Sequence, residues 1–349
     1  MKILYTTDPH EDIAMLQEAG KFGLEQKVDL WLAGGDFIDI PWNLQESHDR
    51  YKKAVNELLR IREQRKFNGS LEELALEVAE QNVSSGLKQI GEDYIAMTGV
   101  AKNNMKERYK KMVKVFDEID IPSKTLPGNY DNNELMNEIF ENSLHLNKEE
   151  LKLNDSKLTI AGYGGAPEWP SWIPHNLIVP FNEEIHYDKK GNVVGGRSEA
   201  VDFFRKNKSD IIITHTHPQS ILDYILNGMG KVEGSNRSAG GSFGLRVYLN
   251  EIQEDKNPSF LWLCGHMHTS NINKGAKKCG KTVVINPGSL SRYRGAIKGA
   301  GTFAIIDTEN KKFEKAIIYA VSDKENERIF PIEEYYITDR GFNKLELLC

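Results

Sequence analysis

Several short apolar runs in this chain break off directly into histidine, aspartate or asparagine side chains. Lys2–Thr7 leads into Asp-Pro-His, Asp210–Thr214 into His-Thr-His, and Phe260–Cys264 into Gly-His-Met-His. Short apolar runs bounded by polar residues are typical of buried strands. In open α/β sheets the reactive groups lie just beyond the carboxyl ends of the strands. The sequence therefore predicts an α/β fold with a polar site where its strands end.

The rest of the chain supports a layered α/β domain. Between the strand-like runs Lys2–Thr7 and Asp29–Gly34, the segment Glu11–Leu24 carries apolar residues at helical spacing. Ser123–Pro127 is a further strand candidate, and it ends in Gly-Asn-Tyr-Asp. The C-terminal part adds three strand-like runs, Thr282–Asn286, Thr302–Asp307 and Lys315–Val321. Strands that alternate with helices favour packed layers of sheet and helix.

Residues 42–120 differ in composition from the rest of the chain. This interval is rich in charged and amide side chains, contains no proline, and carries apolar stripes at helical spacing. The longest stripe consists of Ile90, Tyr94, Met97, Ala101, Met105, Tyr109, Met112, Phe116 and Ile119. We predict a helical insertion whose stripe packs in the core of a small subdomain or, alternatively, forms an oligomer interface. Because the insertion closely follows Gly-Gly-Asp-Phe-Ile-Asp, it is placed to act as a cap or lid.

The composition restricts the classes of partner. The chain has 349 residues and a formal net charge of −6, which gives no general attraction for nucleic acid. Lys102–Lys114 is locally basic, but it interleaves with the apolar stripe and is interpreted as a solvated helix face. No apolar run approaches the roughly 18 residues that span a bilayer. We therefore expect a small-molecule partner, no long nucleic acid and no membrane.

Two features favour a cytoplasmic location. Asp8 interrupts the N-terminal apolar run before the core of a signal peptide could form. The three cysteines, Cys264, Cys279 and Cys349, are too few and too scattered for a disulfide framework. We therefore expect a reducing compartment. A thiolate zinc site is not expected either, because the cysteines lack metal-ligand spacing.

Polar side chains with the chemistry of metal ligands gather after the predicted strands. They are His10, His215, His217, His266, His268, Asp8, Asp36, Asn129 and Asp131. Neutral imidazole and carboxylate oxygen form the ligand set of zinc, iron and manganese. Because one ion does not need so many ligands, the pattern predicts two adjacent divalent ions. Such a pair, about 3.5–4 Å apart, clamps the attacking and leaving oxygens of a displacement at phosphorus, which predicts phosphoester hydrolysis.

The order of these blocks resembles that of the calcineurin-like metallophosphoesterases, whose pattern runs D-x-H, G-D-x-x-D, G-N-H-D/E, a lone His after a strand, and G-H-x-H. The matching blocks here are Asp8-Pro9-His10, Gly35-Asp36-Phe37-Ile38-Asp39, Gly128-Asn129-Tyr130-Asp131, Thr214-His215-Thr216-His217-Pro218 and Gly265-His266-Met267-His268. The tail block Ile285–Ser291 is also similar to smaller bacterial and archaeal members. The resemblance implies an α-β-β-α sandwich of two mixed sheets flanked by helices. It also implies a single domain over residues 1–349, interrupted by the 42–120 insertion.

The resemblance assigns a place to each candidate ligand. Asp8, His10 and His268 would hold the first ion, Asn129, His215 and His266 would hold the second, and Asp36 would bridge the two. His217 remains an alternative ligand or a proton donor. The other four histidines lack a ligand-spaced neighbour and are interpreted as structural or exposed. They are His48, His145, His175 and His186.

Two residues depart from the family pattern. Tyr130 replaces the histidine that would help the leaving oxygen depart, beside the acid Asp131 that would orient it, and Glu11 replaces a glycine. With a pKa of about 10, a tyrosine can donate a hydrogen bond at pH 7 but shuttles protons poorly. We therefore expect esters whose alcohol leaves easily, or proton donation by His217 or Glu11.

The sequence as a whole predicts a phosphomonoesterase or phosphodiesterase that acts on a small or nucleotide-like substrate, with a metal-bridging hydroxide as nucleophile. The catalytic candidates are Asp36, Asn129, Tyr130, Asp131 and His217. Arg292 and Arg294 either hold a substrate phosphate or are solvated surface residues. The glycine-rich segment Gly228–Gly244, with Arg237, either closes over the substrate or is a plain surface loop. A nuclease is the nearest alternative function, and a non-enzymatic scaffold that keeps the fold is another.

Overall fold

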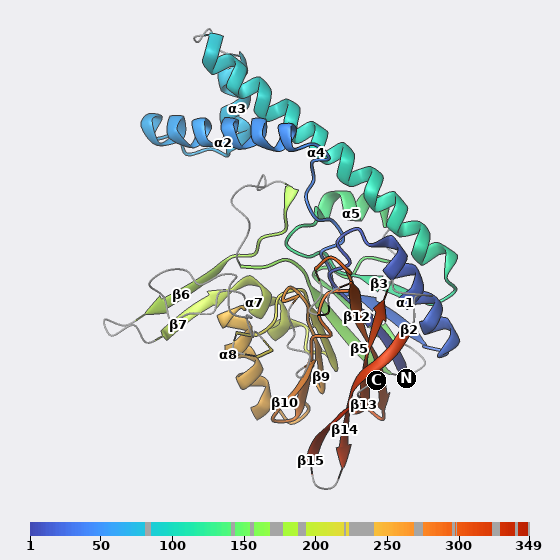
Figure 1. The fold of residues 1–349 in the computed structure, drawn as a ribbon. Coiled ribbons are helices and arrows are strands. Elements are labelled where there is room, and N and C mark those ends of the chain that lie inside the picture. Colours follow the sequence, from blue (N-terminus) through green and yellow to red (C-terminus); the bar gives the residue numbers. More distant parts are fainter. Residues whose placement is uncertain are drawn as a thin grey trace.

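In a computed structural model, the chain forms two mixed β-sheets that pack face to face, with helices on their outer faces (Figure 1). The α-β-β-α sandwich that the sequence predicts is confirmed. The structure describes residues 1–347 except 81–84, 141–143, 154–156, 168–176, 188–192, 220, 223–240, 269–274, 295–296, 298, 323–328 and 339–340. His175, Arg237 and most of Gly228–Gly244 lie outside the described residues.

The larger sheet has the strand order β15-β14-β13-β12-β1-β2-β3. Its strands are β1 (Lys2–Thr6), β2 (Leu30–Ala33), β3 (Ser123–Thr125), β12 (Ala300–Glu309), β13 (Lys312–Ser322), β14 (Ile329–Thr338) and β15 (Gly341–Glu346). β1, β2 and β3 are parallel, whereas β12 pairs antiparallel with β1. The loops that follow the three parallel strands therefore leave the sheet at the same edge.

The second sheet has the order β10-β11-β9-β8-β5-β4. Its strands are β4 (Glu149–Leu153), β5 (Leu158–Tyr163), β8 (Ile211–Thr214), β9 (Leu261–Leu263), β10 (Ala276–Cys279) and β11 (Thr282–Ile285). The central strands β5, β8, β9 and β11 are parallel. A separate hairpin is formed by β6 (Glu183–Tyr187) and β7 (Val193–Ser198).

Successive side chains of the central strands point to opposite faces, as strand geometry requires. Ile3 and Tyr5 of β1 lie between the two sheets, together with Ile213 of β8. Leu4 of β1 instead packs in the outer cluster below the helices of the larger sheet, and Ile212 of β8 packs in the outer cluster of the second sheet. Both faces of these strands are thus buried, which explains why the runs are apolar without alternation.

Among the described residues, four shorter helices lie outside the insertion. They are α1 (Ile13–Glu25), α5 (Asn133–Ile139), α7 (Glu199–Lys206) and α8 (Phe243–Glu251), and a 3₁₀ turn follows at Ile252–Glu254. α1 packs on β1, β12 and β13, and α7 packs on β5. No described helix combines the length and the apolar character that a membrane crossing needs.

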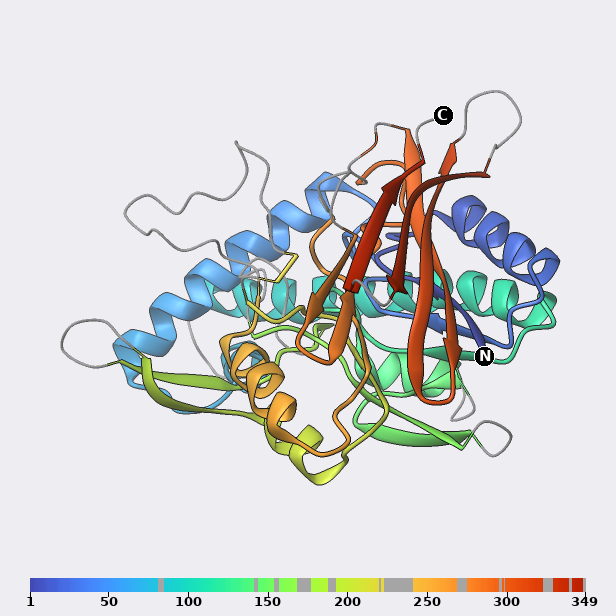
Figure 2. The same ribbon diagram turned by 90° about the horizontal axis from the view of Figure 1, so that it is seen from below.

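The described part of the 42–120 interval forms the helices α2 (Gln45–Arg65), α3 (Leu71–Glu80) and α4 (Ser85–Glu118). The predicted stripe lies buried along α4, from Tyr94 to Phe116. One part of α4 packs on α2 and α3, where Tyr94 contacts the ring of Tyr51. The other part reaches the larger sheet, where Phe116 packs on Trp31 with 4.5 Å between ring centroids. Figure 1 shows α4 as the long helix that joins the outlying α2 and α3 to the flank of the sandwich, and in the view of Figure 2 it runs behind the strands of the C-terminal part.

Candidate metal centre

The loops that follow five strands from both sheets converge on one site. Asp8 and His10 follow β1, Asp36 follows β2, Asn129 follows β3, His215 follows β8, and His266 and His268 follow β9. All seven are the candidate ligands named from the sequence. Their side chains lie together because the parallel strands present their carboxyl ends at the same side of the sandwich.

Several residues of these loops have left-handed backbone conformations. Asp8, His10, Glu11, Asp36 and His266 all have positive φ angles, between 41° and 68°. Residues other than glycine occupy this left-handed region rarely, although Asp and His do so more often than most. Such conformations persist where the surrounding structure holds them, and they cluster at functional sites.

Two glycines allow the loops to approach one another closely. A side chain on Gly35, whose φ is 98°, would place a Cβ 2.4 Å from the backbone nitrogen of Gly128. A Cβ on Gly265 would lie 1.9 Å from Oγ1 of Thr7 and 2.5 Å from Oδ2 of Asp8. The glycine in each of these motifs is therefore required because backbone or ligand side chains occupy the space where Cβ would be.

The first ligand group consists of Asp8, His10, Asp36 and His268, whose candidate donor atoms all lie within 4.8 Å of one another. The Nε2 atoms of His10 and His268 are 2.8 Å apart. Nε2 of His268 lies 3.2 Å from Oδ1 of Asp8, and Nε2 of His10 lies 3.9 Å from Oδ2 of Asp36. Two imidazoles and two carboxylates therefore point their donor atoms at one small volume.

The second group consists of Asp36, His215 and His266. Oδ1 of Asn129 lies 2.9 Å from Nε2 of His215 and 3.0 Å from Nδ1 of His266. Nδ1 of His215 lies 2.9 Å from the carbonyl oxygen of Gly34, which orients the ring so that Nε2 faces the site. Asp36 belongs to both groups, which is the position that the family resemblance implies for a bridging ligand.

The pKa values of the histidines indicate which rings of the site carry a charge at pH 7. Burial lowers the pKa of His10 to about 4 and that of His266 to about 3, so both rings are neutral at pH 7 and can offer a lone pair. Burial also opposes a charge on His215, but the carboxylates of Asp36 and Asp8 outweigh it and raise the pKa of His215 to about 9. A bound divalent ion would replace that proton as the positive charge beside Asp36.

The residues present fit a pair of divalent ions. Oδ1 of Asp8 and Oδ2 of Asp36 are buried, and the groups that face them, Nε2 of His268 at 3.2 Å and Nε2 of His215 at 3.4 Å, are themselves candidate ligands. The other oxygen of each carboxylate is held, by Oγ1 of Thr7 at 2.6 Å and by the backbone nitrogen of Tyr130 at 2.9 Å. Buried carboxylate oxygens without a donor are costly unless a cation pairs with them. The divalent-ion centre predicted from the sequence is chemically consistent with these side chains.

Sequence comparison identifies the family. The sequence model of the calcineurin-like phosphoesterase superfamily domain matches residues 80–311, a stretch that contains Asn129, His215, His266 and His268. The chain belongs to the calcineurin-like phosphoesterase superfamily. Its general activity is therefore the metal-dependent hydrolysis of phosphoesters. No curated protein matches the sequence.

Solved structures align with this phosphoesterase at low sequence identity. One crystal structure aligns with a TM-score of 0.51 and 14% identity, over 88% of this chain and 94% of that chain. A dimetal phosphatase from Danio rerio aligns with a TM-score of 0.49 and 8% identity, over 95% and 98% of the two chains. An archaeal phosphodiesterase aligns with a TM-score of 0.37 and 14% identity, over 91% and 99%.

The catalytic candidates beyond the ligands differ in their surroundings. The ring of Tyr130 lies edge-on to His10, with 6.0 Å between centroids. Burial and the nearby Asp36 raise the pKa of Tyr130 to about 12, so its hydroxyl keeps its proton at pH 7. Asp131 is fully buried and accepts hydrogen bonds from the backbone nitrogens of Phe37 and Gly128, at 3.1 and 2.7 Å. Asp131 therefore holds the neighbouring loops in place.

His217 lies behind the metal centre of the phosphoesterase. Its side chain has no exposed surface, and its ring is 6.4 Å from that of His266. A Cβ on Gly241 would lie 3.0 Å from Nε2 of His217, so the backbone packs closely on this ring. The role of His217 as an alternative ligand or a proton donor stays a prediction from the sequence.

The two arginines of the tail segment have carboxylate partners. Arg292 binds both oxygens of Asp12, at 2.9 and 2.8 Å, and thus helps to hold the start of α1. Arg294 pairs with Asp39 and is partly exposed. It lies close enough to His10 to lower the pKa of that ring. Arg294 is therefore placed near the metal centre, whereas the guanidinium of Arg292 is bound by Asp12.

Three of the remaining histidines are described. His48 is buried in the insertion and stacks on Trp42, with 5.2 Å between ring centroids. His145 is buried, with Nε2 3.2 Å from Oδ1 of Asn133, and His186 is exposed on β6. These surroundings agree with the structural or exposed roles that the sequence predicts.

Several supporting residues of the phosphoesterase site were not recognised from the sequence. The hydroxyl of Ser289 donates to the backbone oxygen of Asp8 at 2.7 Å, and the amide of Asn286 donates to the backbone oxygen of Gly265 at 3.2 Å. Thr7 holds the Asp8 carboxylate. Asn286 and Ser289 could have been found from the sequence, because both lie in the Asn-Pro-Gly-Ser tail block. That block is part of the family resemblance, but no role was predicted for it.

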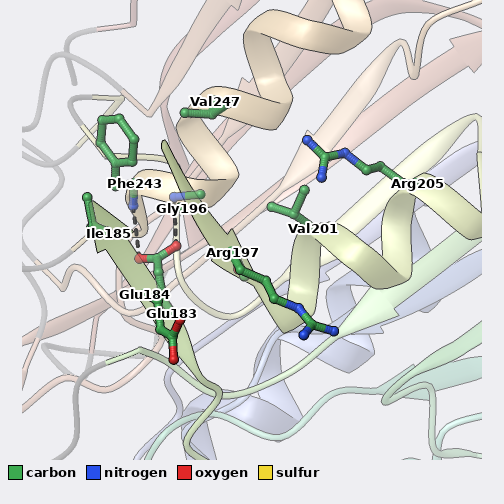
Figure 3. A pocket seen from close by; sticks show the side chains of 11 residues that line it. Glu183, Glu184, Ile185, Gly196, Arg197, Val201, Arg205, Phe243 and Val247 are labelled. Carbon is green, nitrogen blue, oxygen red and sulfur yellow. Dashed lines mark hydrogen bonds between the residues drawn. The ribbon is translucent and has the colours of Figure 1, made fainter. Parts of the chain in front are cut away.

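A cavity of about 300 Å³ lies apart from the metal centre, between the β6–β7 hairpin and helices α7 and α8 (Figure 3). Its lining includes Ile185, Val201, Phe243, Val247, Glu183, Arg197 and Arg205. None of the candidate metal ligands lines it. Glu183 accepts hydrogen bonds from the backbone nitrogens of Phe243 and Gly244, at 3.2 and 2.6 Å, and so satisfies the start of α8. The hairpin is thereby attached to α8.

Proposed function

We propose that this phosphoesterase hydrolyses small phosphomonoesters or phosphodiesters, including nucleotide-like ones, with two ions of manganese, iron or zinc. The observation that carries the proposal is the position of Asp36, which contributes to both ligand groups. A carboxylate shared by two clusters of histidine and aspartate suits two adjacent ions better than one. Asp8, His10 and His268 would hold one ion, and Asn129, His215 and His266 the other.

When bound, the ions would supply an activated water and neutralise charge on the phosphoryl oxygens. The task of the protein is then to hold its ligands in fixed orientations. Thr7 and Ser289 hold Asp8 by its side chain and its backbone, and the carbonyl oxygen of Gly34 orients His215. Such outer contacts fix ring orientation and strengthen ligand binding.

Tyr130 and Arg294 are the residues that we assign to the substrate. The hydroxyl of Tyr130 stays protonated at pH 7 and can donate a hydrogen bond to the departing oxygen. Arg294 can offer its guanidinium to a phosphoryl oxygen, as arginine commonly does for phosphate. Because neither group releases a proton readily, the preferred substrates are esters whose alcohol leaves without protonation.

A panel of esters tests this function. The protein is purified without chelators and assayed with added Mn²⁺ on p-nitrophenyl phosphate, bis-p-nitrophenyl phosphate, an alkyl phosphate, a cyclic nucleotide and a single-stranded oligonucleotide. We expect Mn²⁺-dependent hydrolysis of the activated esters, and slower hydrolysis of the alkyl phosphate. Cleavage of the oligonucleotide alone would favour a nuclease. No hydrolysis with any added metal would favour a scaffold and contradict the proposal.

Three further proposals concern the organisation of the chain. We propose that residues 1–349 form one domain, with the 42–120 insertion as a part of it. Association of chains through the insertion and a cytoplasmic location remain predictions from the sequence. Size-exclusion chromatography with light scattering tests the association of chains, and localisation of a tagged chain tests the cytoplasmic location.

A further inference from the structure

The insertion helix α4 passes directly beside the metal-ligand loops. Arg108 and Tyr109, adjacent residues of α4, make polar contacts with the loops that follow β1, β2 and β3. These three loops carry Asp8, His10, Asp36 and Asn129 among the candidate ligands. The contacts therefore join the insertion to the loops that carry four of the seven candidate metal ligands.

Arg108 connects the β1 loop with the β2 loop. Its guanidinium donates to the carboxylate of Glu11, to the backbone oxygen of Ile40 at 2.6 Å, and to the side chain of Asn43. The same oxygen of Glu11 accepts a hydrogen bond from the backbone nitrogen of Asp39 at 3.1 Å. Glu11 directly follows His10. The ion pair is only partly exposed, at 16% for Arg108 and 30% for Glu11, so solvent weakens it less than a surface pair.

Tyr109 connects the β2 loop with the β3 loop. Its hydroxyl donates to Oδ1 of Asp131 at 3.0 Å and accepts from the backbone nitrogen of Asn132 at 2.8 Å. Asp131 in turn accepts hydrogen bonds from the backbone nitrogens of Phe37 and Gly128, the neighbours of Asp36 and Asn129. Tyr109 and Asp131 are both fully buried, so water cannot replace these bonds without rearrangement.

We propose that Arg108 and Tyr109 are positioning residues for the metal ligands, and that this part of the insertion is a fixed support of the site rather than a lid. His10, Glu11 and Asp36 have left-handed backbone conformations that need external contacts to persist. The two α4 residues supply such contacts. The proposal also explains Glu11, which stands where the family pattern has glycine, because Glu11 is the partner of Arg108. It rests on the metal assignment of the proposed function.

Binding of Mn²⁺ to the metal-free protein, measured by titration calorimetry without substrate, tests the proposal. Tyr109→Phe keeps the buried ring and removes the hydroxyl. Tyr94→Phe, on the same helix and packed against Tyr51 of α2, is the matched control. We expect Tyr109→Phe to weaken Mn²⁺ binding about tenfold, the lower end of the usual effect for outer contacts of a metal site. Tyr94→Phe should bind as the unaltered chain does.

A second pair of variants guards against loss of folding. Arg108→Met removes the contact with the β1 and β2 loops, and Arg50→Met removes an ion pair with Asp93 between α2 and α4. Both are compared at a temperature at which circular dichroism shows a folded chain. We expect weaker Mn²⁺ binding only in Arg108→Met, with activity at saturating Mn²⁺ largely restored.

Two results would overturn the proposal and are distinguishable. Unchanged Mn²⁺ affinity in both Tyr109→Phe and Arg108→Met would refute the positioning role and leave the proposed function intact. Absence of Mn²⁺ binding by the unaltered chain would contradict the proposed function and, with it, the positioning role.

Discussion

The two ends of helix α4 are held by different kinds of contact. Around Tyr94 and Met97 the helix packs on α2 and α3 chiefly through buried apolar and aromatic side chains. The polar contacts of this end, the Arg50–Asp93 ion pair and the hydrogen bond from Nε1 of Trp42 to the backbone oxygen of Met97, stay within the insertion. Around Arg108 and Tyr109 the hydrogen bonds and the ion pair instead reach the loops of the metal centre. Apolar packing is tolerant of small shifts, whereas hydrogen bonds have narrow limits of distance and angle.

This difference indicates how one insertion can serve two purposes. The end of α4 around Tyr94 and Met97, its far end, contributes only to stability. Substitutions there should change the free energy of unfolding and should not change the metal affinity of the folded chain. The part of α4 around Arg108 and Tyr109, its near end, determines where the metal ligands lie. Substitutions there should change metal affinity more than the free energy of unfolding. The predictions below test this separation.

The largest expected effect comes from the metal centre itself. Asp36→Asn removes the shared carboxylate charge and should lower activity on bis-p-nitrophenyl phosphate by more than about 100-fold, beyond the usual effect of an outer contact. Asp93→Asn, in the insertion, is the control and should remain within a few-fold of the unaltered chain. Equal activity of Asp36→Asn and Asp93→Asn at saturating Mn²⁺ would contradict the shared-ligand role.

A large effect on stability is expected at the far end of α4. Met97→Ala leaves a cavity beside Trp42 and the α2 helix and should reduce the free energy of unfolding by about 2–5 kcal/mol. Met97 is 7% exposed and lies in the cluster that contains Trp42. Urea denaturation measures the loss, and calorimetry should show unchanged Mn²⁺ affinity in the folded protein. A loss of Mn²⁺ affinity in the folded Met97→Ala protein would show that the two ends of α4 do not have separate roles.

A small effect is expected from Tyr130→Phe. Because the tyrosine hydroxyl is a hydrogen-bond donor and a poor proton source, activity on activated esters should fall by no more than a few-fold. Steady-state kinetics on p-nitrophenyl and alkyl esters would show a somewhat larger loss for the alkyl ester. A loss as large as that of Asp36→Asn would mean that Tyr130 is essential to the reaction.

The smallest effect is expected from Arg50→Met. The Arg50–Asp93 pair lies on the surface of the insertion, where solvent screens the attraction between the two charges, so it contributes little to stability. Thermal unfolding should shift only slightly, and hydrolysis should be unchanged. A marked loss of hydrolysis would show that the far end of the insertion also affects the site.

The ligand loops could be located from the sequence because strand ends and metal ligands both leave local signals. The apolar runs before Asp8, His215 and His266 are the strands β1, β8 and β9. The long stripe also predicted α4, because a buried helix face repeats at a fixed spacing. The strands β14 and β15 were missed, since Glu333, Glu334 and Lys344 interrupt their apolar pattern. Strand β5 was also missed.

The supporting contacts could not be predicted in this way. The hydrogen bond between Tyr109 and Asp131 joins residues 22 positions apart, and that between Ser289 and Asp8 joins residues 281 apart. Tyr109 looked like one more apolar member of the α4 stripe, because nothing in the spacing shows where its hydroxyl points. The positive φ angles of His10 and Asp36 likewise depend on tertiary contacts, and local preference does not reveal them.

The stoichiometry of bound metal tests the binuclear centre most directly. The metal-free chain and Asp36→Asn are each dialysed against Mn²⁺ and analysed by inductively coupled plasma mass spectrometry, with Asp93→Asn as control. We predict about two ions per chain for the unaltered protein and the control, and a clear loss for Asp36→Asn. One ion or none in the unaltered chain, or two ions retained by Asp36→Asn, would contradict a centre built around Asp36.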